Sequence, residues 1–314
     1  MTNWTTSDIP PQNGRTIVIT GTGGLGYQDA LALSRADASV IIAGRNAEKG
    51  AEALANIRRS VPTAQVRFER LDLADLASVA AFGERLRDEE EAVDVLINNA
   101  GVMTPPRRKV TKDGFELQFG TNYLGHFALT AQLLPLLRRG KDARVVSVSS
   151  TANRTGQIDF DDLQAEKSYK AMRVYAQSKL ANLLFAFELQ RRSEQSDWGL
   201  TSVAAHPGLS RTDLLPNGTG RASMTSIVMR HLLGHVVLQP AAQGALPTLY
   251  AATSPEAKAG AYYGPDKRRE TRGYPALAQV PPQAIEQEVA RRLWKISEEL
   301  CEVTFSDVDL GVAR

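Results

Sequence analysis

A tyrosine and a lysine four residues apart are the side chains of this sequence best suited to acid–base chemistry. Tyr175 and Lys179 lie in residues 175–189, where apolar residues recur at helical spacing. Residues four apart share one face of a helix, and a cationic lysine favours the phenolate form of a nearby phenol. We therefore expect Lys179 to lower the pKa of Tyr175, so that the phenol can give or take a proton in catalysis. The alternative is a surface lysine beside a half-buried tyrosine.

A glycine-rich turn upstream has the spacing of a phosphate-binding loop. Residues 16–20 are a β-branched run typical of a buried strand, and a helical pattern follows the turn as far as Arg35. Gly21 permits a tight turn, Gly23 lets the backbone approach a pyrophosphate, and Gly26 lets the helix pack closely on the strand. The first N–H groups of the helix would then face the phosphates. We assign cofactor binding to Gly21, Thr22, Gly23, Gly24, Leu25 and Gly26. The alternative is a turn that binds nothing.

The end of the second predicted strand indicates which dinucleotide would bind. Residues 39–43 are apolar and largely β-branched, and Gly44 and Arg45 follow them. NAD sites usually place an acidic residue near this point for the ribose 2′-hydroxyl, and this sequence has none there. Arg45 can meet a 2′-phosphate with two parallel hydrogen bonds. We expect NADP(H) as the cofactor, with NAD as the alternative and a solvated loop arginine as the simpler interpretation.

Polar residues also follow the later strands of the chain. Asn98-Asn99-Ala100-Gly101 follows residues 93–97, Ser149 and Ser150 end residues 144–150, and His206-Pro207-Gly208 follows residues 200–205. Open α/β sheets bind ligands at such strand ends. Asn122 lies mid-helix in residues 114–137, among apolar residues, where asparagine is a poor helix former. A buried asparagine needs partners, so Asn122 either bonds a neighbouring backbone or serves a site.

The elements that must position these residues alternate along the chain. Strands are predicted at 16–20, 39–43, 65–69, 93–97, 144–150, 200–205 and near 261–263, and helices at 25–35, 47–60, 76–90, 114–137, 175–189, 241–252 and 282–303. Alternation of this kind predicts an α/β protein with a doubly wound parallel sheet, the Rossmann fold. No linker divides the chain, so residues 1–314 are predicted to form a single domain. An N-terminal tail (1–14), a substrate lid (209–239) and a C-terminal helix (282–303) complete it.

The composition is that of an ordinary soluble protein. With a net charge of +2 the sequence has no electrostatic footprint for nucleic acid. The single cysteine, Cys301, excludes an intrachain disulfide and zinc sites that need two or more cysteines. His231 and His235 are four apart but have no evident third ligand, so we predict no metal site. No stretch reaches about 18 apolar residues, and the N-terminus has no apolar run. We therefore expect a cytoplasmic protein without a membrane span or signal peptide.

In this order, the motifs resemble the short-chain dehydrogenase/reductase family. They are the glycine turn after the first strand, Asn-Asn-Ala-Gly after the fourth, the serines after the fifth and Tyr-x-x-x-Lys on the next helix. The likeness covers residues 14–303. The long spacing between Ser150 and Tyr175, and residues 175–186, are similar to the branch that contains retinol dehydrogenases and the oxidoreductase domain of WW-domain oxidoreductases.

The resemblance implies a role for each matching residue. Ser150 would hydrogen-bond the substrate carbonyl oxygen, Tyr175 would transfer the proton, and Lys179 would bond the nicotinamide ribose and depress the Tyr175 pKa. Asn122 would hold a water that links Lys179 to solvent. Further cofactor contacts would come from Asp72 and Leu73 at the adenine, Asn99, Ala100 and Gly101 at its ribose, and Pro207, Gly208 and Thr212 at the nicotinamide. Ser149 is the alternative to Ser150, which the family pattern favours.

The implied reaction is hydride transfer between the nicotinamide and the carbonyl or alcohol carbon of a small molecule. The mixed residues in 102–109, 153–160 and 209–238 suit a medium-sized apolar ketone or aldehyde, and a homo-oligomer is an open alternative to a monomer. The glycine turn is one residue shorter than the family's usual turn, which favours a second hypothesis, a non-catalytic dinucleotide-binding regulator. A third is a non-redox enzyme of the same fold, such as a dehydratase or an epimerase.

Overall fold

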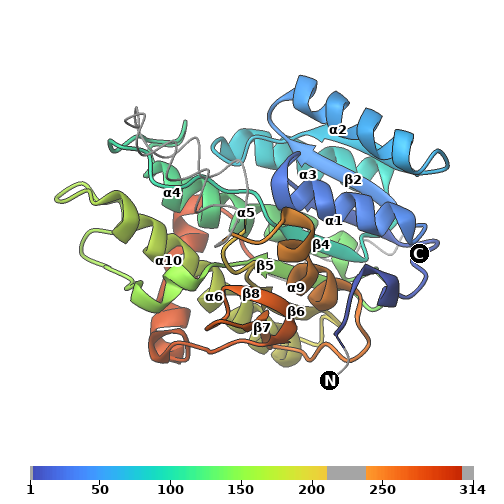
Figure 1. Cartoon of the computed structure of the whole chain (residues 1–314). Coiled ribbons are helices and arrows are strands. Elements are labelled where there is room, and N and C mark those ends of the chain that lie inside the picture. The colour runs from blue at the N-terminus through green and yellow to red at the C-terminus, as the bar shows by residue number, and fades with distance from the viewer. Residues whose placement is uncertain (1–2, 211–237, 306–314) are drawn as a thin grey trace, which may run out of the picture.

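Eight strands form one sheet with helices on both faces (Figure 1). The computed structural model describes residues 3–210 and 238–305. The strand order is β3-β2-β1-β4-β5-β6-β7-β8, and all neighbours run parallel except β7 and β8. The strands are β1 (Thr16–Thr20), β2 (Ser39–Gly44), β3 (Val66–Arg70), β4 (Val95–Asn98), β5 (Arg144–Val148), β6 (Thr201–Ala205), β7 (Tyr262–Lys267) and β8 (Arg272–Leu277). The predicted doubly wound parallel sheet and single domain are confirmed.

Parallel strands must be joined by crossovers, and helices supply them on both faces of the sheet. One face carries α1 (Gly24–Arg35), α2 (Ala47–Ser60) and α9 (Ala241–Thr253), and the other carries α3 (Leu76–Glu89), α5 (Gly125–Leu137) and α6 (Ala171–Gln195). Helix α10 (Gln287–Cys301) packs on α5 and α6. Short helical turns are η1 (Thr6–Asp8), α4 (Leu117–Phe119), η2 (Gly120–Leu124), η3 (Thr151–Thr155) and η4 (Pro282–Ala284).

The central strands are largely apolar because both of their faces are covered. Val18 and Ile41 pack with α3, α5 and α6, whereas their neighbours Ile17 and Ile42 pack with α1, α2 and α9, and all four side chains are fully buried. Successive side chains of a strand point to opposite faces, so each strand contributes to two cores. Strand β8 was not predicted, because an edge strand that contains Gly273 and a proline has no such apolar run.

Three helices differ from the predicted ranges. The helix predicted for residues 114–137 begins at Leu117, because the Glu116 carboxylate accepts a hydrogen bond from Phe119 N at 2.7 Å and caps the first turn. It then makes one π-helical turn, η2, before α5. Helix α6 begins at Ala171, so Tyr175 lies in its second turn rather than at its start. The helix predicted for residues 282–303 is the turn η4 followed by α10.

The predicted tail and lid have different outcomes. From residue 3 onward the tail is ordered: Thr5 caps η1, and the Trp4 ring contacts Tyr250 of α9 edge to face at 5.4 Å between centroids. In the predicted lid, residues 211–237 lie outside the described residues. The two ends that enter this stretch, Ser210 and Gln239, form a parallel bridge. Every helix in the described part of the chain is too short or too polar to cross a membrane.

One acidic side chain conflicts with the apolar packing between α1 and the sheet. Asp29 is fully buried, and within the described residues neither of its carboxylate oxygens has a hydrogen-bond partner. Burial raises the pKa of this carboxyl well above its usual value, because the charged form loses its water. Asp29 therefore destabilises the fold at neutral pH.

We expect Asp29→Ala to increase the free energy of unfolding at pH 7 by about 1–3 kcal/mol, the usual cost of an unsatisfied buried polar group. The folded-state pKa is raised, so above the unfolded pKa, about 3.9, only the unfolded state releases the proton. The gain from the substitution should therefore grow as the pH rises from 4 toward 7. Urea unfolding at both pH values measures it, with the exposed Glu84→Ala on α3 as the control. A less stable Asp29→Ala protein at pH 7 would contradict this account.

Candidate active site

The polar ends of three strands lie side by side because the strands are parallel and in register. Asn98 of β4 pairs with Ser147 of β5, and Val148 of β5 pairs with Ala205 of β6. Each strand therefore stops at the same edge of the sheet. The segments after the strands meet at this edge; they are residues 99–101, 149–150 and 206–208. This is the edge at which open α/β sheets bind ligands, as the sequence pattern predicted.

Ser150, Tyr175 and Lys179 come together at this edge. Lys179 and Tyr175 are buried on α6, and the Lys179 Nζ atom lies 5.9 Å from the centroid of the Tyr175 ring. Lys179 Nζ donates a hydrogen bond to the carbonyl oxygen of Val148 at 3.0 Å. The Ser150 side chain lies close enough to Tyr175 to lower the pKa of that phenol. The structure thus places a hydroxyl, a phenol and an ammonium group in one cluster.

The ionisation of this pair differs from the expectation. Burial lowers the pKa of Lys179 to about 8, because the ammonium loses its water. Burial also raises the pKa of Tyr175, and the nearby Ser150 hydroxyl only partly opposes this rise. The expectation of a lowered Tyr175 pKa is therefore wrong. The ammonium group of Lys179 bonds the carbonyl oxygen of Val148, and the phenol of Tyr175 is deeply buried.

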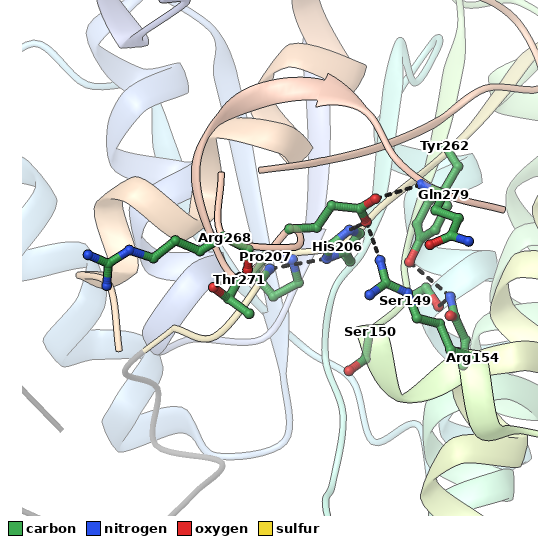
Figure 2. Close-up of polar contacts among 12 residues, drawn as sticks. Ser149, Ser150, Arg154, His206, Pro207, Tyr262, Arg268, Thr271 and Gln279 are labelled. Carbon is green, nitrogen blue, oxygen red and sulfur yellow. Dashed lines mark hydrogen bonds and ion pairs between the residues drawn. The ribbon is translucent and has the colours of Figure 1, made fainter. Parts of the chain in front are cut away.

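The two neighbouring serines have different surroundings. The Ser149 hydroxyl donates to the carbonyl oxygen of Lys179 at 2.7 Å and accepts from the Asn153 amide at 3.1 Å. The Ser150 side chain points away from Ser149 (Figure 2) and caps the turn η3 by accepting from Ala152 N at 3.2 Å. Ser149 therefore anchors β5 to α6, whereas Ser150 faces Tyr175.

Asn122 lies in the π-helical turn and holds the loop after β4. Its side chain accepts from Val102 N at 2.7 Å and donates to Val102 O at 3.0 Å and to Ser178 Oγ at 3.0 Å. A Cβ atom built on Gly101 would lie 3.1 Å from Asn122 Oδ1 and 3.7 Å from Lys179 Nζ. Asn122 therefore bonds a neighbouring backbone, and Gly101 brings that loop close to Lys179. The water assigned to Asn122 stays a prediction.

The glycine turn has the geometry that its spacing indicated. Gly21 and Gly24 have φ values of +100° and +53°, which favour glycine. A Cβ atom on Gly26 would lie 2.6 Å from the carbonyl oxygen of Gly21, so only glycine allows this contact between turn and helix. Gly23 precedes the first turn of α1 and offers it no side-chain cap, unlike Asn46 at α2. The first N–H groups of α1 therefore have no side-chain partner there.

Arg45 lies beside the glycine turn. A Cβ atom on Gly44 would lie 2.9 Å from the methyl group of Thr22, so the end of β2 packs against this turn. Arg45 follows at once, its side chain is exposed, and it makes no ion pair with the described residues. The structure thus leaves a guanidinium group next to the predicted phosphate loop.

The other predicted cofactor residues are spread along the same edge. Thr20 Oγ1 accepts from Asn99 N and Ala100 N, each at 2.9 Å, and joins the ends of β1 and β4. The Asp72 carboxylate accepts from Ala74 N at 3.0 Å and shapes the turn that contains Leu73. Pro207 and Gly208 follow β6, and Thr212 lies outside the described residues.

The sequence analysis gave no role to two buried histidines at this edge, because the four histidines are far apart or without a clear motif. His126 of α5 contacts Asn122 O through Nδ1 at 3.0 Å and Thr20 Oγ1 through Nε2 at 2.9 Å. Burial lowers the pKa of His126 to about 4, so the ring is neutral at pH 7. Since a carbonyl oxygen only accepts, Nδ1 carries the proton. The available signal was the position of His126 one helical turn after Asn122.

The second histidine is His206, whose signal was its place directly after a buried strand. His206 Nε2 lies 3.0 Å from a carboxylate oxygen of Glu270, and Arg154 pairs with the same oxygen at 2.5 Å. Figure 2 shows His206 between Pro207 and Arg154. Among residues 3–210 and 238–305, no group of three or more His, Cys, Asp and Glu side chains could hold a metal ion. His231 and His235 lie outside these ranges.

Known proteins resemble this chain over most of its length. The family model described as "short chain dehydrogenase" matches residues 15–221. The human protein named "Retinol dehydrogenase 14" is 39% identical over 305 residues, and the match covers 91% of this chain and 86% of that protein.

Solved structures share the fold. An uncharacterized protein from Mycobacterium Paratuberculosis has a TM-score of 0.80 at 39% identity, and the match covers 97% of this chain and 100% of that one. A short chain dehydrogenase from Shigella flexneri, complexed with NADP, has a TM-score of 0.63 at 21% identity, with 81% and 98% covered. At this lower identity the likeness concerns the fold alone.

The buried ammonium group gives a measurable titration. In protein with ¹³C-labelled lysine ε-carbons, we expect one NMR signal to titrate near pH 8, since burial lowers the Lys179 pKa to about 8. This signal should be missing in Lys179→Met. The folded-state pKa lies below the usual 10.5, so the native protein should also gain stability relative to Lys179→Met as the pH rises from 8 to 10. Lys112, whose pKa Asp75 raises, is the internal control. Titration of every lysine above pH 10 would contradict the prediction.

Proposed function

The chain belongs to the short-chain dehydrogenase family, and from that premise we propose that it is an NADP(H)-dependent oxidoreductase. The reaction is hydride transfer between the nicotinamide and the carbon of a ketone, aldehyde or alcohol. The observation that carries the proposal is the convergence of Ser150, Tyr175 and Lys179 at the sheet edge where the glycine turn also lies. A hydroxyl, a phenol and an ammonium group at the carboxyl ends of parallel strands can transfer a proton to a substrate oxygen next to a bound dinucleotide.

Each residue has one task in this proposal. Ser150 donates a hydrogen bond to the substrate oxygen, and Tyr175 gives that oxygen a proton during reduction. The raised pKa of Tyr175 keeps the phenol protonated until the oxygen takes the proton. Lys179 is cationic at pH 7, since its pKa is about 8, and hydrogen-bonds the nicotinamide ribose. The cofactor, when bound, supplies or accepts the hydride.

The residues present fit a dinucleotide with a 2′-phosphate. The turn from Gly21 to Gly26 admits a close backbone approach, and the first turn of α1 has N–H groups without a side-chain cap. Arg45 provides a charge beside this turn, and its planar guanidinium suits bidentate phosphate binding.

We infer a medium-sized apolar carbonyl or alcohol as the substrate class, because the segment after Ser150 carries the apolar, partly buried Ile158 and Phe160 and the human relative is named a retinol dehydrogenase. Of the residues 209–238 that were also predicted to contact the substrate, 211–237 lie outside the described residues. The cytoplasmic location and the choice between monomer and homo-oligomer stay predictions.

A spectrophotometric screen of NADPH and NADH oxidation against aromatic, aliphatic and steroid-like carbonyls tests the proposal. We expect NADPH to be consumed with an apolar aldehyde or ketone. Cofactor binding without turnover over the whole panel would instead indicate the non-catalytic regulator. Product formed with no net cofactor consumption would indicate a dehydratase or an epimerase.

Tyr175→Phe removes the proton donor and little volume. We expect the variant to fold and its kcat to fall by about 100-fold or more, the usual loss for an acid–base group. The matched control is Tyr250→Phe on α9, which should keep the native rate. Its ring contacts Trp4, and the next residue, Ala251, bonds Arg144 at the opposite end of β5. A native rate in Tyr175→Phe would rule out the assigned mechanism.

Arg45→Ala should discriminate between the two dinucleotides. We expect the KM for NADPH to rise by about 10- to 100-fold, since a hydrogen bond to a charged group contributes about 1.5–3 kcal/mol. The KM for NADH, which lacks the 2′-phosphate, should hardly change. The exposed Arg35→Ala on α1 controls for net charge. Equal changes in both constants would show that Arg45 does not bind the phosphate.

A further inference from the structure

A carboxylate from the last hairpin reaches into the loops around the candidate active site. Glu270 Oε2 accepts from Arg154 Nη2 at 2.5 Å and contacts His206 Nε2 at 3.0 Å, and its Oε1 accepts from Gln279 N at 2.8 Å. We refer to Glu270, Arg154 and His206 as the Glu270 cluster. Figure 2 shows His206 and Arg154 converging on one point, with Ser150 close by and pointing away.

The three members of the Glu270 cluster come from three different elements. Arg154 belongs to η3, the turn that Ser150 caps. His206 directly follows β6 and precedes Pro207 and Gly208. Glu270 lies in the connection between β7 and β8. A single carboxylate therefore links the loop of the proposed catalytic serine to the loop assigned to the nicotinamide.

The protonation states favour a fixed arrangement. Gly208 N donates to His206 Nδ1 at 3.2 Å, so Nδ1 accepts and the proton of the neutral ring is on Nε2, which donates to Glu270. Burial lowers the pKa of His206, so the ring stays neutral at pH 7. The pKa of Glu270 is lowered: burial opposes this, but the hydrogen bonds from His206 and Gln279 and the charge of Arg154 prevail.

The backbone around Glu270 is held in unusual conformations. Arg268, Arg269 and Glu270 have φ values of 50°, 55° and 63°, a left-handed region that residues other than glycine rarely occupy. Such conformations persist only where the surroundings hold them, and they cluster at functional sites. Thr271 O accepts from Leu209 N at 2.8 Å, and a Cβ atom on Gly208 would lie 2.5 Å from the same oxygen. The hairpin thus packs closely against residues 206–209.

The turn on the other side of Glu270 is also anchored. Gln283 Nε2 lies within hydrogen-bonding distance of three carbonyl oxygens, those of Asn153, Arg154 and Gly156. Asn153 Nδ2 donates to the Tyr262 hydroxyl of β7 at 2.8 Å. These contacts hold the backbone of η3, and the Arg154–Glu270 ion pair is its charged link to the hairpin.

We propose that Glu270 is a positioning residue of the active site, which fixes the Ser150 turn relative to the His206–Leu209 segment. Its consequence for catalysis rests on the proposed function. With the carboxylate in place, the group that holds the substrate oxygen and the segment assigned to the nicotinamide keep one separation. Without it, Arg154 and His206 lose their shared partner, and the separation of the two loops is less closely fixed. Displacements of about 1 Å at such a site can cost about 100-fold in rate.

The test is Glu270→Gln, which keeps the shape of the side chain and removes its charge. The matched control is Glu288→Gln on α10, whose carboxylate pairs with Arg291 at 2.6 Å on the surface. A second variant, Arg154→Met, removes the same ion pair from the other side and leaves the Glu270–His206 contact. It keeps the proposal testable if Glu270→Gln does not fold.

The first readout needs no cofactor. In hydrogen exchange of the cofactor-free protein, we expect peptides that contain residues 151–156 and 206–210 to exchange faster in Glu270→Gln, and peptides of β1 and α1 to exchange as in the native protein. Exchange that increases evenly along the chain would indicate a general loss of stability and would overturn the proposal.

The second readout separates the two halves of the cofactor. Calorimetric titration should show NADPH binding about 10-fold weaker in Glu270→Gln, one lost interaction of about 1.4 kcal/mol, while 2′,5′-ADP binding stays within about twofold. In the carbonyl assay, kcat should fall by about 10- to 100-fold in both variants, and the double variant should be no slower than the slower single one.

The outcomes distinguish the two proposals. If the native protein reduces no carbonyl but Glu270→Gln weakens NADPH and not 2′,5′-ADP, the proposed function fails and the positioning role stands. If the native protein is active and Glu270→Gln keeps the native exchange pattern, NADPH affinity and kcat, the positioning role fails and the function stands.

Discussion

The parallel register of β4, β5 and β6 is the constraint on which the rest of the structure depends. The strands are buried on both faces, and their polar side chains lie within two residues of a strand end. The register puts these ends at one edge, which brings the loops at residues 99–101, 149–150 and 206–208 together. Helix α6, which packs on β5 and β6, then places Tyr175 and Lys179 over the same edge.

Buried polar groups at this edge are held by one another. Lys179 donates to the carbonyl oxygen of Val148, and Ser149 donates to the carbonyl oxygen of Lys179, so the end of β5 and the helix α6 are joined twice. On the other side, Thr20, His126 and Asn122 connect β1, α5 and the loop after β4. A buried polar group without a partner is costly, so each network fixes the position of its elements. The candidate catalytic groups are therefore held rigidly before any ligand binds.

At this edge of the sheet, backbone groups and side chains have different roles. At the glycine turn the absence of side chains matters, because the close contact of Gly26 with Gly21 O and the uncapped first turn of α1 leave backbone N–H groups for phosphates. At the catalytic cluster the side chains matter. Burial raises the pKa of Tyr175 above its usual value and lowers the pKa of Lys179 below its usual value. Membership of the short-chain dehydrogenase family agrees with both features.

The sequence by itself determined the fold and the outline of the site. The alternation of apolar strands with amphipathic helices, the glycine spacing and the Tyr175–Lys179 spacing are local patterns, and local patterns dictate secondary structure and which residues share a face. They were sufficient to predict the doubly wound sheet, which the structure confirms, and a tight turn at Gly21, where the structure has a φ of +100°.

Only the tertiary structure decided how the side chains meet. Ser149 and Ser150 look alike in the sequence, but contacts with Asn153 and Lys179 separate them. Glu270 lies 116 residues from Arg154, so no local spacing could pair them. The direction of the Tyr175 pKa shift depended on burial, which exceeds the effect of its neighbours. Contacts between distant segments and the loss of water arise from packing of the whole chain, and no short stretch of sequence contains either.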